Sequence, residues 1–270
     1  MRIFGIIAVL LLIVAQAHPV HADTFTSDTC GQGALNIPDA TYDGSGNIVP
    51  GVLTCSLLVT GFGTIDVGNA VTVSLLGLAQ EESGDLIASV THCNADGTAC
   101  GSPGYLFYRI GATSDVLTDP GYFGFYYPQF GFSSGTGDNY SFNSGFTGDL
   151  WGTAAALGSA DYIPGVLAGG GSYWTTGPFS AAATPFSSYF AGQPVAGDWV
   201  LEIEDVFPGP SDPSVEGSLG EWQLTVETTA VPEPGYGGMI ATALAAIAAR
   251  RRFRRDEASG LQVHTRPLTT

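Results

Sequence analysis

The chain has 270 residues, and its 25 acidic residues stand against eight arginines and no lysine, which gives a formal net charge of −17. Between Asp23 and Ala230 the only basic residue is Arg109, so the net charge of this body is about −21. Such a surface repels nucleic acid and anionic lipid, because proteins bind both of them through Lys and Arg side chains. It suits hard divalent cations such as calcium, or plain solvation outside the cell.

The amino terminus, residues 1–22, has the pattern of a secretory signal peptide. Ile3 to Ala15 is a short apolar run behind a positive start, and we expect it to be helical. Small residues at Val20-His21-Ala22 predict cleavage by signal peptidase before Asp23, and Ala15-Gln16-Ala17 offers a second cleavage site. A retained membrane helix is the alternative, for which the run is short.

The body shows short apolar runs that alternate in period two, which predicts an all-β fold. The runs are Val71–Leu75, Leu86–Val90, Leu106–Ile110, Trp199–Glu204 and Trp222–Val226, and the last two are the clearest. In the fourth run Trp199, Leu201 and Ile203 fall on one face of the strand. Turn clusters such as Glu82-Ser83-Gly84-Asp85 and Asp96-Gly97 separate the runs. Short strands at this spacing favour a jelly-roll-type β-sandwich.

All four cysteines lie in the part of the chain that is expected to be exported, where disulfides form and persist. They are Cys30, Cys55, Cys93 and Cys100. Three pairings are possible, and the favoured one joins Cys30 to Cys55 and Cys93 to Cys100, because a turn-rich stretch separates the second pair. A zinc site is not expected, since the spacing fits no metal knuckle.

Few residues of the body could support catalysis. His92 is its only histidine, but the neighbouring Cys93 is expected in a disulfide and no nucleophile elbow is visible, so a structural role is favoured. Glu202 and Glu204 share one strand face and could in principle form an acid pair for glycoside hydrolysis. That face is expected to be solvated, opposite Trp199. We therefore expect the chain not to be an enzyme.

The loop after the Trp199 strand is the best candidate for a calcium site. Its carboxylates stand among Gly and Pro turns, where backbone carbonyls are also available as ligands. The candidate ligands are Glu204, Asp205, Asp212 and Glu216. Ordinary turn residues are the alternative interpretation.

Residues 122–132 are unusually aromatic. If exposed, their rings would form a platform for sugar rings or a partner surface. The candidate platform residues are Tyr122, Phe125, Tyr126 and Tyr127. The alternative is a pair of strands that buries one face, and it is the favoured interpretation.

Three features follow one another at the carboxyl end, within residues 231–255. Pro232, Glu233 and Pro234 precede a run of small apolar residues, Gly235 to Ala249, and a cluster of arginines follows. The cluster consists of Arg250, Arg251, Arg252, Arg254 and Arg255. This order resembles the PEP-CTERM sorting signal of Gram-negative bacteria, which an exosortase recognises and processes.

The apolar run has 15 residues, fewer than the ~20 that span a bilayer comfortably. The arginines would stay cytoplasmic by the positive-inside rule, with residues 256–270 as a cytoplasmic tail. These features predict a short anchor helix that holds the body transiently at the inner membrane. A plain carboxyl-terminal membrane anchor is the alternative.

A second resemblance covers residues 66–228 and depends on the order of several short motifs. These are Gly84-Asp85-Leu86-Ile87, Asp96-Gly97-Thr98, Gly148-Asp149-Leu150-Trp151, Gly197-Asp198-Trp199-Val200-Leu201 and Glu221-Trp222-Gln223-Leu224. Together they resemble the P domain (P/Homo B domain) that follows the catalytic domain in subtilisin-like proprotein convertases. The resemblance implies a β-sandwich, here without a protease domain. Because the segment from Thr113 to Ser188 is longer than the family loop, loop functions are not carried over.

The expected organisation is a signal peptide, an amino-terminal β extension with a disulfide, a P domain-like sandwich, a sorting signal and a tail. Their bounds are 1–22, 23–65, 66–228, 231–255 and 256–270. The expected function is that of a non-catalytic structural or adhesive protein of the cell envelope or exopolysaccharide matrix, with signal peptidase and exosortase as partners during export. The alternatives are a carbohydrate-binding module that uses residues 122–132 and, less favoured, a polysaccharide hydrolase.

Overall fold

The computed structural model describes most of the body of the chain. The described residues are 20–26, 35–61, 63–65, 70–80, 82–115, 130–131, 137–157, 167, 170–208 and 217–229. They fall within one compact unit, Met1–Ala230. The predicted sorting signal and tail, and all but the last three residues of the predicted signal peptide, lie outside the described residues.

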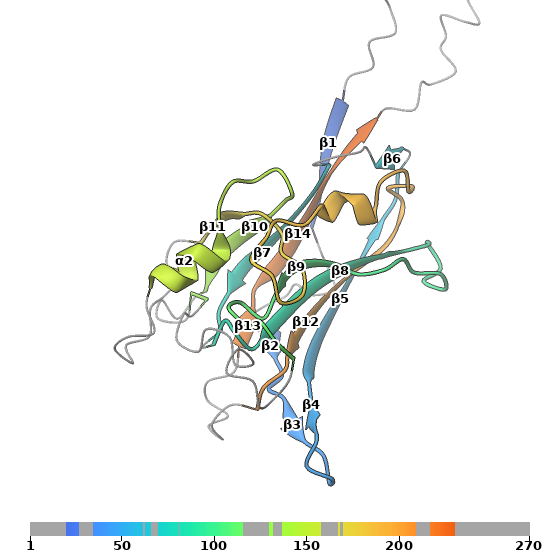
Figure 1. Cartoon of the computed structure of the whole chain (residues 1–270). Helices are drawn as coiled ribbons and strands as arrows, with labels where there is room; N and C mark the ends of the chain where they lie inside the picture. The colour runs from blue at the N-terminus through green and yellow to red at the C-terminus, as the bar shows by residue number, and fades with distance from the viewer. Residues whose placement is uncertain are drawn as a thin grey trace, which may run out of the picture. The chain divides into compact units, whose positions relative to one another are not determined.

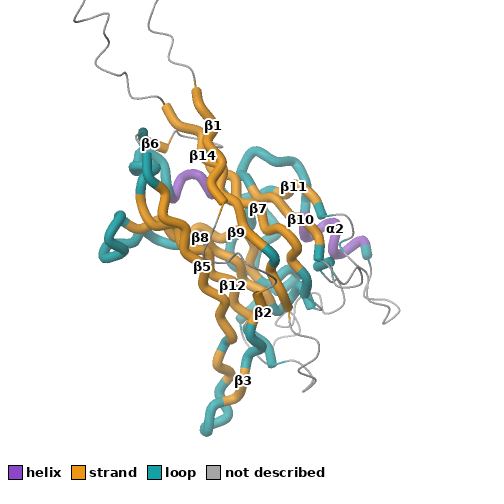
Figure 2. Tube along the Cα trace, turned by 180° about the vertical axis from the view of Figure 1, so that it is seen from behind, coloured by secondary structure: helices purple, strands orange, loops and turns teal. Residues whose placement is uncertain are grey.

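The larger of two main sheets has six strands, in the order β1-β14-β7-β10-β11 with β6 paired to β14. Its strands are β1 (Val20–Thr26), β6 (Thr64–Ile65), β7 (Val71–Leu78), β10 (Asp138–Phe142), β11 (Gly171–Tyr173) and β14 (Glu221–Thr229). All pairs are antiparallel except β10 with β11. Figure 2 shows β1, β14, β7 and β10 side by side.

The smaller main sheet has four antiparallel strands, in the order β5-β12-β8-β9. Its strands are β5 (Gly51–Val59), β8 (Leu86–Cys93), β9 (Gly104–Tyr108) and β12 (Gly197–Asp205). Two short pairs complete the described strands: β2 (Leu35–Ile37) with β13 (Gly217–Leu219), and β3 (Thr41–Tyr42) with β4 (Ile48–Val49). Figure 1 shows the course of these strands from β1 to β14. The all-β prediction is therefore confirmed.

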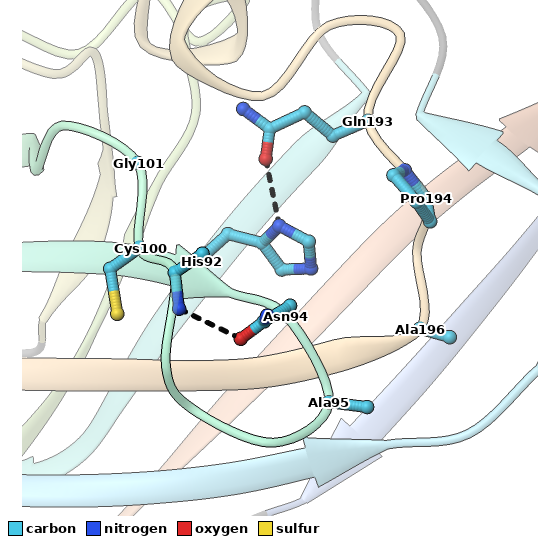
Figure 3. A pocket seen from close by; sticks show the side chains of 9 residues that line it. His92, Asn94, Ala95, Cys100, Gly101, Gln193, Pro194 and Ala196 are labelled. Atoms are coloured by element: carbon cyan, nitrogen blue, oxygen red, sulfur yellow. Dashed lines mark hydrogen bonds between the residues drawn. The ribbon is translucent and has the colours of Figure 1, made fainter.

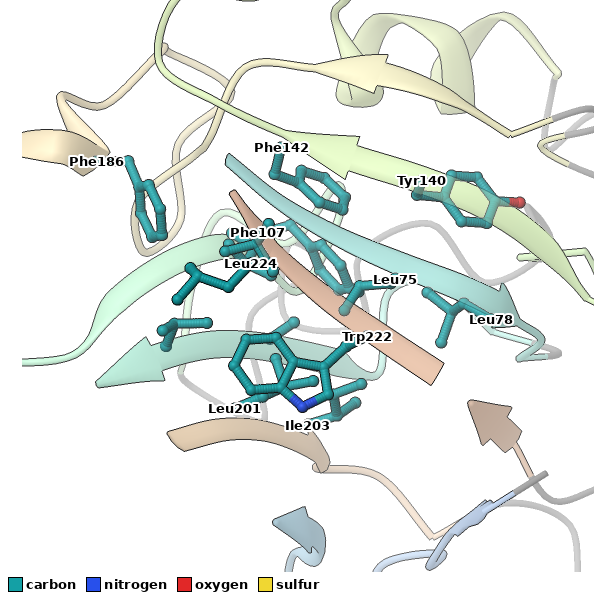
Figure 4. Close-up of a cluster of buried hydrophobic side chains, with 14 of the residues drawn as sticks. Leu75, Leu78, Phe107, Tyr140, Phe142, Phe186, Leu201, Ile203, Trp222 and Leu224 are labelled. Atoms are coloured by element: carbon teal, nitrogen blue, oxygen red, sulfur yellow. The ribbon is translucent and has the colours of Figure 1, made fainter. Parts of the chain in front are cut away.

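One apolar core lies between the two main sheets, because each sheet buries one face of its strands. Along β12 buried and partly exposed residues alternate, and Trp199, Leu201 and Ile203 are fully buried, as the period-two pattern predicts. From the larger sheet, the side chain of Trp222 on β14 lies over Leu201 and Ile203 (Figure 4). The five apolar runs that the sequence singles out all contribute strands to this core.

The segment predicted as an amino-terminal extension supplies strands to both main sheets. β1 pairs with β14 over seven residues, and β5 pairs with β12 over nine. Leu57 and Val59 of β5 are buried in the shared core. Residues 23–65 therefore belong to the same packed body as the strands that follow them.

The third predicted strand differs from expectation in its extent and its alternation. β9 ends at Tyr108, because Arg109 has a φ of 40°, in the left-handed region. A register shift in the β8–β9 pairing lets Leu106 and Phe107 both face the core, where strict alternation would send one of them outward. The bulge leaves Tyr105 and Tyr108 partly exposed on the outer face of the sheet.

The sequence pattern predicted no helix in the body, yet Leu150–Ala156 forms a short helix, α2. The carboxylate of Asp149 accepts a hydrogen bond of 2.9 Å from the backbone N–H of Gly152 and so caps the amino end of this helix. Leu150, Trp151 and Ala154 face the core. None of the described helices has the length and apolar character needed to cross a membrane.

The predicted disulfide between Cys93 and Cys100 is confirmed. It closes the turn between β8 and β9 across an isolated antiparallel bridge of the two residues. Cys55 is also disulfide-bonded, and its predicted partner Cys30 lies outside the described residues. Disulfides in proteins form and persist mainly in oxidising compartments.

Candidate functional site

The alternation of β12 separates two of the predicted calcium ligands. Asp205 is 4% exposed and faces inward, whereas the neighbouring Glu204 is partly exposed on the opposite face. Asp212 and Glu216 lie outside the described residues. Glu204 and Asp205 therefore do not point into one site, although the calcium prediction itself stays a prediction.

Asp205 is held by two hydrogen bonds at the end of β12. Its Oδ2 accepts from Nε2 of Gln80 at 2.9 Å, and its Oδ1 accepts from the backbone N–H of Phe207 at 3.1 Å. Burial nevertheless raises the pKa of Asp205 to about 7, with the charges of Asp39 and Glu82 acting in the same direction. Asp205 is therefore poised to hold a proton or to face a cation near neutral pH.

Two further carboxyl groups are buried in the turn before β8. Glu82 and Asp85 are 7% and 4% exposed, and the carboxyl of Glu82 is near enough to Asp85 to affect its pKa. Burial, the Glu82 contact and the charge of Asp205 raise the pKa of Asp85 well above its usual range, and Arg109 opposes them. We call Gln80, Glu82, Asp85 and Asp205 the buried acid cluster.

Arg109, the only basic residue of the body, lies beside this cluster and is only 3% exposed. Its Nε–H donates to the carbonyl oxygen of Gly84 at 3.3 Å, within the turn that carries the two acids. Its backbone N–H donates to Leu86, at the start of β8. The single positive charge of the body is therefore buried, where it compensates part of the negative charge of the buried acid cluster.

Sequence reasoning treated Glu82 and Asp85 only as turn residues and did not connect them with Asp205. The connection is tertiary, because the turn before β8 and the end of β12 meet only when Asp205 pairs with Leu86 across the sheet. One sequence signal was available: the sole arginine of the body stands in a predicted strand, where an unpaired charge is costly. A buried arginine of this kind predicts buried acids around it.

The described residues contain no three His, Cys, Asp or Glu side chains already arranged around one point as a metal site. The buried acid cluster is therefore not a coordination shell, and its one printed side-chain hydrogen bond joins Gln80 to Asp205. Its chemistry is that of buried oxygen atoms, and burial raises the pKa values of Asp85 and Asp205, which favours proton binding.

His92 lies on β8 beside a cavity of about 490 Å³ between residues 92–101 and 193–196 (Figure 3). The amide of Gln193 donates to the carbonyl of Tyr189 at 2.8 Å, so its Oε1 faces the imidazole and accepts from Nδ1 at 2.7 Å. The ring packs on Trp199 with centroids 4.6 Å apart. Nε2 is buried without a partner against Gly197, where an added Cβ would lie 2.3 Å away. This arrangement supports the structural role over a catalytic one.

A second group of aromatic rings lies on the outer face of the smaller sheet. Tyr108 of β9 packs edge-on against Tyr105 and Phe179, with ring centroids 5.4 and 4.9 Å apart. Burial is the main cause that raises the pKa of Tyr105, and the charge of the nearby Glu204 raises it further. We call Tyr105, Tyr108 and Phe179 the outer aromatic cluster. It places partly exposed aromatic rings and the nearby carboxylate of Glu204 on the outer face of the sheet.

The predicted aromatic platform falls almost entirely outside the described residues, and so do Tyr122, Phe125, Tyr126 and Tyr127. Near the end of that stretch, Phe130 is described and is fully buried. Its ring packs against Phe107 and Tyr140, with centroids 5.2 and 4.9 Å apart. This residue therefore belongs to the core, as the alternative interpretation expects.

Comparisons with known proteins leave the family open. No protein-family model matches the chain, and no curated protein matches it. Crystal structures of an Aeromonas sobria serine protease, alone and in complex with the chaperone ORF2, are similar at 13% identity and a TM-score of 0.34. They cover 81% and 83% of this chain, which spans only 29% and 30% of those chains. A TM-score this low carries no argument about function.

The fold and sites thus define an acidic, disulfide-bonded all-β protein with buried acids between its strands. Its particular role rests on the sequence signals at its ends and on the chemistry of its surfaces.

Proposed function

We propose that this chain is a non-catalytic structural or adhesive protein of the cell envelope or exopolysaccharide matrix of a Gram-negative bacterium. Its body would be a jelly-roll sandwich of P-domain type, exported behind a cleaved signal helix and sorted by an exosortase. The observation that carries the proposal is the order of Pro232-Glu233-Pro234, the short apolar run and the arginine cluster after an all-β body.

Two properties of the body support export, and a third supports a non-catalytic role. Disulfides such as Cys93–Cys100 persist mainly in oxidising compartments. The absence of lysine from the sequence leaves a strongly acidic surface, which keeps the protein soluble and apart from anionic membranes. His92 is engaged by Gln193 and Trp199, in an arrangement that serves packing.

Sorting is tested by expressing the full chain, tagged after Asp23, in a Gram-negative host with and without its exosortase. We expect a smaller, released product only when the exosortase is present, because processing removes the anchor. Replacing Pro232, Glu233 and Pro234 by alanine should leave the protein in the inner-membrane fraction, whereas replacing Asp256 and Glu257 should not. Equal release with and without the exosortase would remove the sorting proposal.

A second candidate function, carbohydrate binding, is favoured by the outer aromatic cluster. Aromatic rings bind the apolar faces of sugars, and carboxylates such as Glu204 accept their hydroxyl hydrogens. Co-sedimentation of the purified chain with exopolysaccharide from the same host tests this candidate. Tyr108→Ala should reduce binding several-fold if the cluster is the site, with Tyr42→Ala on the exposed β3 strand as the control.

A further inference from the structure

The outer face of the smaller sheet places two carboxylates in line with two tyrosines. Glu202 and Glu204 of β12 are partly exposed on this face, and so are Tyr105 and Tyr108 of β9. Because β8 lies between β12 and β9, each glutamate is two strands, or about 10 Å, from the backbone of a tyrosine. The two rows of paired residues that cross these strands are Glu202–Ser89–Tyr105 and Glu204–Ile87–Tyr108.

The middle of each row is covered by neighbouring side chains. Ile87 and Ser89 point outward from β8 and yet are only 7% and 5% exposed. Beside them, the ring of Tyr108 packs edge-on against the rings of Tyr105 and Phe179, with centroids 5.4 and 4.9 Å apart. Each ring of the outer aromatic cluster is therefore held by another, so the cluster presents a fixed apolar surface next to the two carboxylates.

Phe179 joins this cluster at a conformational cost. It follows Pro178 in a turn and has a φ of 55°, in the left-handed region that bulky residues rarely adopt. Glycine would take this conformation with less strain, whereas phenylalanine brings a ring to the edge of Tyr108. Strained backbone positions of this kind gather at binding and active sites. The strain therefore points to a use for the Phe179 ring on the outer face.

The two glutamates have no compensating charge on this face. Arg109 is the only Lys or Arg in residues 23–230, and it is 3% exposed, so the body has no basic side chain left for its surface. Within the described part of the chain, the carboxylates of Glu202 and Glu204 accept no hydrogen bond from another residue. The face therefore offers a pair of charged acceptors to a cation that comes from outside the protein.

We propose that the outer face of the smaller sheet binds a polysaccharide whose sugars carry free, protonated amines, such as a chain of β-linked glucosamine. The rings of the outer aromatic cluster bind the apolar faces of the sugar units, and the ammonium groups donate to Glu202 and Glu204. The aromatic faces attract the same ammonium groups. This inference rests on the carbohydrate-binding candidate above and names the class of sugar that the site selects.

Other ligands fit this face less well. A neutral glycan leaves both carboxylates without an opposite charge, and an acidic glycan is repelled. A basic peptide supplies the charge, but it loses backbone and side-chain freedom when it is held on a flat face. A chain of rigid sugar rings loses less, and two linked units span the distance between a tyrosine on β9 and a glutamate on β12. The combination of rings and carboxylates therefore favours the amino-sugar chain.

The test is isothermal titration calorimetry of the full chain in a mild detergent at pH 6. The two probes are a hexamer of β-1,4-linked glucosamine and its fully N-acetylated counterpart. We expect the free-amine hexamer to bind at least tenfold more tightly, because acetylation removes the charge and keeps the rings. Glu202→Gln and Glu204→Gln should each weaken its binding at least threefold, and Phe179→Gly should weaken it while relieving the backbone. Glu227→Gln, which removes an exposed carboxylate from β14 of the larger sheet, should keep the full affinity.

Equal affinity for the two hexamers, with both lost in Tyr108→Ala, overturns the amino-sugar proposal and leaves the carbohydrate-binding candidate standing. Binding of neither hexamer also overturns the proposal, and the exopolysaccharide co-sedimentation then decides whether the broader candidate falls with it. Hexalysine that binds as tightly as the glucosamine hexamer and is equally sensitive to Glu204→Gln makes a basic peptide the partner instead. The proposal is equally overturned if Glu227→Gln weakens binding as much as Glu204→Gln, because the net charge of the whole body would then attract the probe.

Discussion

Nε2 of Gln80 donates a buried hydrogen bond of 2.9 Å to Oδ2 of Asp205, although 125 residues separate them in the sequence. Gln80 follows β7 of the larger sheet, and Asp205 ends β12 of the smaller one. The bond therefore ties the two sheets together at the edge of the core, beside Glu82 and Asp85.

Replacing Gln80 by Leu should destabilise the fold by about 1–3 kcal/mol, because it leaves a buried carboxyl oxygen without its donor. The free energy of unfolding is measured by urea denaturation at pH 7.5. The control is Gln223→Leu, which alters a partly exposed amide on β14. Equal losses in the two variants would show that the inter-sheet bond contributes nothing specific.

The stability of the body should fall as the pH rises from 5 to 8 in the presence of chelator. The folded pKa of Asp205, about 7, lies above its ordinary value of 3.8, and that of Asp85 is raised in the same direction. The folded state therefore binds more protons than the unfolded state in this window, and stability is lost as these acids ionise. Asp43 and Asp96 have lowered pKa values and act only at lower pH.

Asp205→Asn should flatten this pH dependence, because asparagine mimics the protonated acid. At pH 8 the variant should be more stable than the wild type by on the order of 2 kcal/mol, and at pH 5 the difference should be small. Urea denaturation at both pH values measures it. Asp198→Asn, on the outer face of the same strand, should leave the slope unchanged. A wild-type stability that rises from pH 5 to 8 would contradict the buried-acid account.

Arg109→Met should destabilise the body by about 3–5 kcal/mol at neutral pH, because it removes the charge that partly compensates the buried acids. The loss should shrink at pH 5, where Asp205 is protonated. Circular dichroism melts at the two pH values measure this difference. Arg109→Lys keeps the charge but loses the Nε donor to Gly84, and we expect an intermediate loss. A pH-independent effect would mean that Arg109 acts only through packing.

The mature amino terminus should be His18 rather than Asp23 if the chain is exported. β1 begins at Val20, and cleavage before Asp23 would remove the pairs that Val20, His21 and Ala22 form with β14. Cleavage after the second candidate, Ala15-Gln16-Ala17, keeps all seven pairs. The intact mass of the exported protein decides between the two sites. A terminus at Asp23 would show that the shorter β1 is sufficient.

The sequence by itself determined the all-β class, the cores of five strands and the Cys93–Cys100 pairing. These depend on local signals: alternation places Trp199, Leu201 and Ile203 on one face, and a short turn brings two cysteines together. The resemblance of Pro232-Glu233-Pro234 to a sorting motif also comes from the sequence alone, and it stays a prediction.

Only the tertiary structure decided which polar residues meet. Strand alternation sends Glu204 outward and Asp205 inward, and sheet pairing brings Asp205 to the turn with Glu82 and Asp85. A bulge opposite Ala88 and Ser89 turns Tyr105 and Tyr108 to the same outer face. Such contacts arise from the pairing of distant strands, which produces no periodic pattern in the sequence. The physical reason is that contacts between distant segments are selected by the packing of the whole core.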